Sequence, residues 1–79
     1  MWLKERDRII NLDHVAVIEA YDTFMAVRFS GEEARRGVPY MVKEYGSAEE
    51  ASKAVGDIAE LITEANSIPF ADNNVVFEV

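Results

Sequence analysis

The chain has 79 residues and a mass of 8.9 kDa, which is enough for one hydrophobic core and predicts a single domain over residues 1–79. Its composition, 49% hydrophobic and 29% charged, is that of a folded globular protein and excludes an intrinsically disordered one. The net charge of −7 argues against direct binding to nucleic acid, and the lack of cysteine excludes disulfides, thiolate nucleophiles and cysteine-ligated zinc.

Residues 9–45 predict a series of strands, because β-branched and aromatic residues recur there in alternation and in short runs. A first short strand at residues 9–10 ends at a turn, and a longer strand follows at residues 14–21. Alternation along the longer strand predicts that Val15 and Val17 share one face, opposite to Ala16, Ile18 and Ala20.

Two further strands should complete an antiparallel meander. Asp22 and Thr23 predict a hairpin turn into a strand at residues 24–30. Residues 31–37 are a charged connection, which is either a plain loop or a second contact site. They lead into a strand at residues 38–45.

The helix has the strongest local signal in the chain. Ser47 is placed as the N-cap and Glu50 stands three residues later, which is the capping-box pattern. The helix should run over residues 48–65, because its apolar residues recur at three- and four-residue steps. They form one stripe, which must cover a sheet. The stripe contains Ala48, Ala51, Val55, Ile58, Ile62 and Ala65, and it is widened by Ala54 and Leu61.

The chain after the helix predicts one more strand. Pro69 prevents the helix from restarting, and a turn at residues 72–74 leads into a short strand at residues 75–79. The expected fold is α+β: an antiparallel sheet of four to five strands with one long helix packed on one face, in the order strand, strand, strand, strand, helix, strand. The last strand has an exposed edge, so it can pair with its own sheet or with another copy of the chain.

Few residues point to catalysis or cofactor binding. Asp13 and His14 could act as an oriented general base, but no serine or cysteine follows a recognisable nucleophile pattern, so His14 is interpreted as a structural or surface residue. No phosphate-binding loop, histidine pair or calcium-loop spacing occurs. We therefore expect a protein that is not an enzyme and that holds no cofactor and no metal.

The aromatic residues allow two interpretations. Trp2 stands beside a run of charged residues and is either a lid on the core, which is the preferred interpretation, or an exposed anchor for a partner. The others either pair across strands or form a recognition surface on the open face of the sheet; they include Tyr21, Phe24, Tyr40 and Tyr45.

Charge is distributed unevenly along the chain. Residues 1–43 contain seven acidic and seven basic residues, whereas residues 44–79 contain eight acidic residues and a single basic one, Lys53. Four acidic residues follow the helical repeat on the face opposite the apolar stripe, namely Glu49, Asp57, Glu60 and Glu64. With Glu50 in the first turn, they form either a binding surface or a solvated face that keeps a small protein soluble.

In its size, lack of cysteine, missing catalytic residues and acidic helix face, the chain resembles the small phage-encoded anti-CRISPR proteins. The resemblance rests on these overall features and on no shared motif. It implies an inhibitor that blocks DNA binding by a CRISPR effector complex. Successive helical turns are about 5.4 Å apart, comparable with the phosphate spacing of a single strand, so a line of carboxylates can occupy a groove built for a nucleic-acid backbone.

Residues 10–15, followed by two strands and the helix start, also resemble short proteins of bacterial and prophage genomes, which fits a mobile-element origin. No apolar run approaches the roughly 18 residues of a membrane span. The charged first residues are unlike a signal peptide. The expected location is therefore the cytoplasm of a bacterial host.

The function expected from the sequence is a non-catalytic binding protein, a phage or mobile-element inhibitor. Its partner would be a basic nucleic-acid-binding protein surface such as a CRISPR effector subunit, contacted through Glu49, Glu50, Asp57, Glu60 and Glu64. Direct binding to nucleic acid or membrane is not expected, and the chain would be a monomer or homodimer. The alternative is an intracellular adaptor or self-associating module that uses the open sheet face, Trp2 or the C-terminal strand. Salt should weaken the first kind of contact and spare the second.

Overall fold

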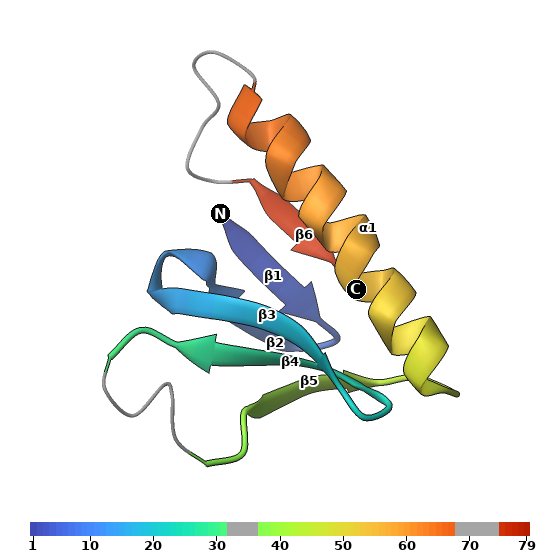
Figure 1. The fold of residues 1–79 in the computed structure, drawn as a ribbon. Coiled ribbons are helices and arrows are strands. Elements are labelled where there is room, and N and C mark those ends of the chain that lie inside the picture. Colours follow the sequence, from blue (N-terminus) through green and yellow to red (C-terminus); the bar gives the residue numbers. More distant parts are fainter. Residues whose placement is uncertain (32–36, 68–74) are drawn as a thin grey trace.

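Figure 1 shows a computed structural model of the chain, which describes residues 1–31, 37–67 and 75–79. The loop at residues 32–36, Pro69 and the turn expected at residues 72–74 lie outside the described residues. The described elements, in chain order, are β1 (Trp2–Glu5), β2 (Arg8–Asn11), the 3-10 helix η1 (Leu12–His14), β3 (Val15–Tyr21), β4 (Phe24–Phe29), β5 (Tyr40–Glu44), α1 (Ala48–Ser67) and β6 (Val76–Glu78).

The α+β class is confirmed, but the strands form two three-stranded sheets instead of one antiparallel sheet. Their orders are β2-β1-β6 and β3-β4-β5. The second sheet is antiparallel, whereas the first is mixed, because β1 is antiparallel to β2 and parallel to β6. The first and last strands of the chain therefore lie side by side (Figure 1), and α1 packs mainly against β3 and β4.

The C-terminal strand pairs with its own chain. The Trp2 N–H donates to the carbonyl of Val75 at 2.8 Å, and the Val79 N–H donates to that of Lys4 at 2.9 Å. Leu3 lies opposite Phe77 in this parallel pair. Of the two pairings that the sequence left open for this strand, the structure has the intramolecular one.

Strand β1 escapes the sequence analysis because its pattern is short and charged. Leu3 and Glu5 point inward and are buried, while Trp2 and Lys4 lie on the opposite face. A buried glutamate breaks the apolar alternation by which a strand is recognised. The preferred interpretation of Trp2 as a core lid is wrong: its side chain is half-buried on the outer face of the sheet, and it is not among the described residues that pack against the core.

The second sheet confirms the expected hairpin. Asp22 and Thr23 form the turn, and Tyr21 lies opposite Phe24. The register between β3 and β4 shifts between Val15 and Val17, which is a β-bulge. Because of this extra residue, Val15 and Ile18 both pack against the core, and the expectation that Val15 and Val17 share a face is wrong.

The start of α1 agrees with the expected cap in all but one bond. The Glu50 N–H donates to Ser47 Oγ at 3.1 Å. The Glu50 carboxylate accepts from the N–H of Gly46 at 3.0 Å, one residue earlier than in a standard capping box. The helix ends at Ser67, two residues beyond the expected end.

The apolar stripe of α1 covers the sheets as expected, with two exceptions. Ala51, Ile58 and Ala65 are buried, and the partly buried residues beside them include Ala54, Val55 and Ile62. Ala48 and Leu61 are exposed, and Leu61 retains 44% of its accessible surface. Their inclusion in the stripe is wrong because both lie at its margins on the helix circumference.

One core lies between the two sheets and α1. Every strand except β3 contributes a buried residue to it, and the core residues are Leu3, Ile10, Met25, Val27, Val42, Ile58, Ala65 and Phe77. Partly buried residues of β3 close it on one side. In the part of the chain that the structure describes, no helix has the length and apolar character needed to cross a bilayer.

The tight turns that join β1 to β2 and β3 to β4 each hold a non-glycine residue in the left-handed region, Arg6 and Asp22, with φ of 53° in both. This backbone costs a residue with a Cβ atom about 1 kcal/mol, whereas glycine adopts it freely. We expect Arg6→Gly to raise the free energy of unfolding by about 0.5 kcal/mol, since the greater freedom of glycine in the unfolded chain offsets part of the gain. Urea denaturation measures this change in the free energy of unfolding. Asp7→Gly is the control and should bring no gain, and a destabilised Arg6→Gly would contradict the argument.

Candidate functional site

The acidic residues selected from the sequence lie together on α1. We call them the acidic face: Glu49, Glu50, Asp57, Glu60 and Glu64. All five are exposed. At about 100° of rotation per residue they fall within an arc of about 100°, turned away from the buried Ile58. The exposed Lys53 lies in the same arc. The helix therefore presents one strongly negative side to the solvent.

Glu50 differs from the other members because its carboxylate already has a role in the fold. It accepts the hydrogen bond from the Gly46 N–H and so closes the start of the helix. A partner that draws this carboxylate away would weaken the N-terminal cap. The other four acidic residues have no such bond among the described residues, so they define the part of the acidic face that is available for a partner.

Some acidic residues elsewhere in the chain take part in internal ion pairs, whereas others are exposed and take part in no described salt bridge, namely Asp7, Asp22, Glu44 and Glu78. Glu5 lies 2.8 Å from Arg8 and 3.5 Å from Arg6, and Glu19 lies 3.1 Å from Arg28. Within residues 1–31, 37–67 and 75–79, no salt bridge includes a residue of the acidic face. The acidic face therefore differs from the rest of the chain in that its exposed carboxylates lie close together on one element.

The helix itself does not benefit from all of this charge. Its first turn contains Glu49 and Glu50, which interact favourably with the positive end of the helix dipole, and its last turn contains no basic residue. Glu64 lies in the last turn of α1, where a carboxylate costs about 0.3 kcal/mol, and Glu60 lies too far from either end to gain from the dipole. Their placement is therefore not explained by the stability of α1.

The field of the acidic face reaches the sheet through Tyr45. Burial raises the pKa of the Tyr45 hydroxyl above its ordinary value, and the negative charges of Asp57 and Glu5 raise it further. The Lys43 ammonium lies 5.3 Å from the centre of the Tyr45 ring. Asp57 is therefore the member of the acidic face whose charge acts on Tyr45.

The Asp13 and His14 pair lies away from α1's acidic face and is occupied by local contacts. Asp13 donates its N–H to the Asn11 side chain at 3.0 Å, and its carboxylate lies 4.0 Å from the N-terminal amine. His14 is exposed, and its carbonyl accepts from the Ser30 N–H at 2.7 Å. No hydrogen bond joins the two side chains among the described residues. In the same residues, no three His, Asp or Glu side chains gather as a metal site would require.

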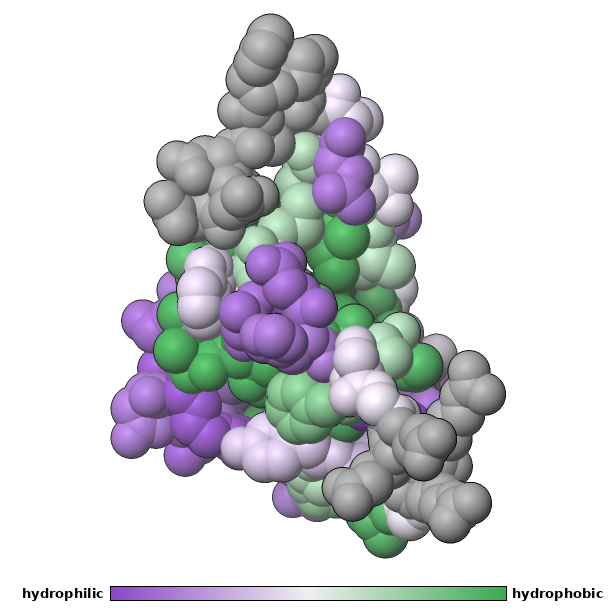
Figure 2. All heavy atoms as spheres, turned by 90° about the vertical axis from the view of Figure 1, so that its left-hand side faces the viewer, coloured by the Kyte–Doolittle hydropathy of each residue, from purple (hydrophilic) through white to green (hydrophobic). Residues whose placement is uncertain are grey.

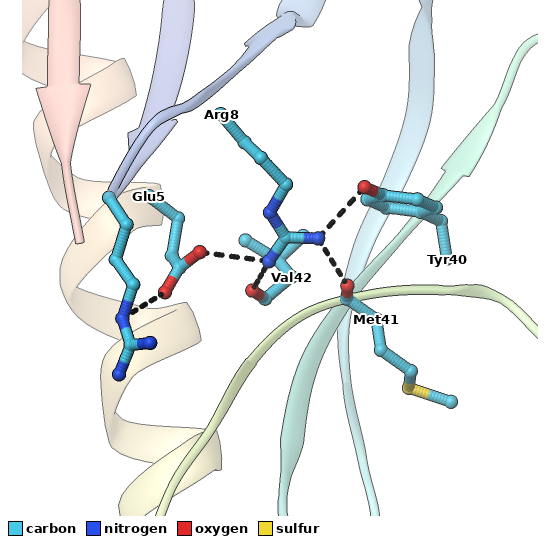
Figure 3. A network of polar contacts seen from close by, with 6 residues as sticks. Glu5, Arg8, Tyr40, Met41 and Val42 are labelled. Carbon is cyan, nitrogen blue, oxygen red and sulfur yellow. Dashed lines mark hydrogen bonds and ion pairs between the residues drawn. The ribbon is translucent and has the colours of Figure 1, made fainter.

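The sequence analysis missed Arg8, whose side chain makes hydrogen bonds to four other residues. Figure 3 shows its guanidinium between the two sheets, where it donates to the Glu5 carboxylate and the Tyr40 hydroxyl, both at 2.8 Å, and to the carbonyls of Met41 and Val42. The Tyr40 ring centre is 5.5 Å away. The hydrogen bonds with Glu5 and Tyr40 raise the Arg8 pKa above its ordinary value. The guanidinium therefore joins β2 of one sheet to β5 of the other.

Beside Arg8 lies a shallow cleft of about 590 Å³, lined by residues 5–8, Phe24 and residues 41–44. Its charges are of both signs, and the arginine that would hold an anion is bonded to protein acceptors. We interpret this region as a structural contact that holds the two sheets together. The spacing of Glu5 and Arg8 across a hairpin is a readable signal for their pairing, but the carbonyl acceptors on β5 lie more than thirty residues away in the sequence.

Comparisons of the chain with protein-family models, with curated proteins and with solved structures find no match. The functional argument therefore depends on the residues themselves.

Proposed function

We propose that the chain is a non-catalytic binding protein that docks on a basic protein surface through the acidic face of α1. The observation that carries the proposal is the grouping of exposed carboxylates on one side of α1: five of them lie within an arc of about 100° and take part in no described salt bridge. A surface of this kind steers a basic partner toward it and repels acidic ones.

The partner that we propose is the nucleic-acid-binding surface of a CRISPR effector subunit in a bacterial host. Two arguments support it. A groove that binds nucleic acid carries Lys and Arg at intervals set by the phosphates, and the carboxylates of Asp57, Glu60 and Glu64 recur about one helical turn, or 5.4 Å, apart. The size and acidity of the chain also resemble those of phage-encoded anti-CRISPR proteins. In this proposal the chain is an inhibitor that competes with DNA.

Charge reversal tests the proposal. The variant Glu49→Lys, Asp57→Lys, Glu60→Lys, Glu64→Lys leaves the cap residue Glu50 intact and is expected to bind a purified CRISPR effector at least about tenfold more weakly, because attraction becomes repulsion. Binding of the unmodified protein should fall between about 50 and 500 mM salt, since the Debye length shortens roughly threefold. DNA should compete with it.

A matched control separates the acidic face from net charge. Asp7→Lys, Asp13→Lys, Glu44→Lys, Glu78→Lys reverses four exposed acidic residues outside α1 and changes the net charge by the same amount. It should retain most of the binding. Equal losses in the two variants, or binding that survives reversal of the acidic face, would show that this face is not the binding surface.

A second candidate function rests on the outer face of the sheet β2-β1-β6. Trp2 lies beside Val76 on this face, and Ile9 lies beside Lys4; Val76 is 50% exposed and Ile9 57%. Exposed apolar residues around a tryptophan are typical of a protein contact. This favours an adaptor or self-associating module. Such a contact would be insensitive to salt and to reversal of the acidic face, and it would be lost in Ile9→Lys.

A further inference from the structure

Strand β3 has one edge without a strand partner in the described part of the chain. It is the first strand in the order β3-β4-β5, so only β4 pairs with it. Tyr21 and Phe24 close the hairpin, and the residues that bond to β4 alternate from there. Ile18 and Ala20 therefore direct their backbone N–H and C=O groups toward the other edge. An edge of this kind accepts an added strand.

A groove follows this edge, between β3 and α1. It consists of two adjoining hollows of about 390 Å³ and 340 Å³, which share Ile18 and Ile62. Four consecutive residues, 15–18, line the first hollow. Val15 and Ile18 pack against the core whereas Ala16 and Val17 are exposed, so core-facing and solvent-facing residues both line this hollow, as expected at the edge of the strand. Figure 2, which views the molecule from the left-hand side of Figure 1, shows apolar side chains lying between hydrophilic ones on this face.

The chemistry of the groove is apolar inside and acidic at its helical rim. The second hollow is lined by Ile18 and by uncharged residues of α1, namely Val55, Ile58, Ala59, Ile62 and Thr63. Glu60 lies about 60° around the helix from Thr63, so the acidic face begins just outside the groove. At the other end, the first hollow is lined by the exposed Asp13 and by Met1, whose N-terminal amine lies 4.0 Å from the Asp13 carboxylate, so the acidic character of the rim comes from Glu60. Apolar side chains fit the floor, and positive charges fit the rim.

We propose that this groove binds an extended basic peptide, which adds to β3 as a fourth strand of the sheet β3-β4-β5. Alternate side chains of a strand point to opposite sides, so apolar residues of the peptide enter the two hollows while lysine or arginine residues face the acidic rim. The peptide would run between β3 and α1 and exchange hydrogen bonds with Ile18 and Ala20. The floor of the groove and the edge of β3 lie outside the acidic face, which meets the groove at Glu60.

The first experiment uses a synthetic probe, an acetylated and amidated peptide of about nine residues in which valine and lysine alternate. Amide hydrogen exchange of the full chain is measured with and without it. We expect exchange at Ile18 and Ala20 to slow at least about tenfold, because their N–H groups become hydrogen-bonded. A valine and glutamate peptide of the same length is the control and should give no protection. Protection by both peptides, or by neither, would overturn the proposal.

Two variants test the groove from its two walls. Ala20→Pro removes an outward N–H from the edge, where proline is tolerated, and should abolish binding of the lysine peptide, whereas Ala20→Val should retain it. Ala59→Arg places a long charged side chain in the groove and should also abolish binding, whereas Ser52→Arg adds the same charge outside it. Circular dichroism confirms folding in each case. Binding that survives both Ala20→Pro and Ala59→Arg would refute the groove.

Two further outcomes distinguish this proposal from others. Protection of Ile18 and Ala20 that rises with protein concentration in the absence of peptide would identify a second copy of the chain as the occupant and overturn the assignment to a peptide. Loss of effector binding on reversal of the acidic face, with no protection by the lysine peptide, would leave the proposed function intact and reject the groove.

Discussion

Truncation of Leu3 to alanine is expected to lower the free energy of unfolding by about 3 kcal/mol. The Leu3 side chain has no accessible surface and lies at the centre of the mixed sheet, opposite Ile10 on one side and Phe77 on the other. The loss combines the transfer free energy of the removed atoms with the cost of the cavity that remains. A domain of this length has a total stability of about 4–12 kcal/mol, so the variant should be close to unfolding.

Urea denaturation followed by circular dichroism measures this loss. Lys4→Ala is the matched control, since Lys4 is the next residue of β1, is exposed on the opposite face, and should change stability by less than about 0.5 kcal/mol. The contrast between neighbouring residues tests whether β1 is a strand with one buried face. Similar effects of the two truncations would contradict the position of β1 in the core.

Arg8→Lys is expected to lower the melting temperature by several degrees although it keeps the charge. The guanidinium donates at once to the Glu5 carboxylate, the Tyr40 hydroxyl and two carbonyls of β5. Lysine has a single ammonium group and cannot reach acceptors arranged around a planar fork. Glu5 is nearly buried and would lose its shorter ion pair, and the contact between the two sheets would lose its polar bonds.

Arg6→Lys is the control for Arg8→Lys, because it is the same substitution at a position two residues away. The Arg6 side chain is 88% exposed, and its contact with Glu5 is the longer one, at 3.5 Å. Calorimetry should show little change in its melting temperature. If both substitutions shift the melting temperature equally, Arg8 does not join the sheets. Tyr40→Phe removes one acceptor, and its melting temperature should lie between those of the two lysine variants.

The helix and the central hairpin were predictable because their determinants are local. Ser47 and Glu50 bond to backbone groups within four residues, and the apolar stripe needs only the helical repeat. The turn at Asp22 and Thr23 likewise depends on neighbouring residues. The acidic face follows from the same repeat, since a helix brings residues three and four apart onto one side whatever it packs against.

Features that depend on contacts between residues far apart in the chain could not be predicted from the sequence. Strand β1 pairs with β6, at the other end of the chain, and its inward Glu5 is tolerated because Arg8 lies across the hairpin. The bulge between Val15 and Val17 reverses the alternation that a regular strand would have. Trp2 faces outward for the same reason that Leu3 faces inward: neighbouring residues of a strand point to opposite sides, and the core lies on the side of Leu3.

The sequence by itself determined the α+β class, the long capped helix and the exposed line of carboxylates along it. Only the tertiary structure decided that the strands divide into two sheets, that Arg8 joins them, and that the edge of β3 forms a groove with α1. The first group of features arises from interactions within a few residues, which periodicity and capping patterns record. The second arises from contacts between residues far apart in the sequence, which depend on how the elements pack around a common core.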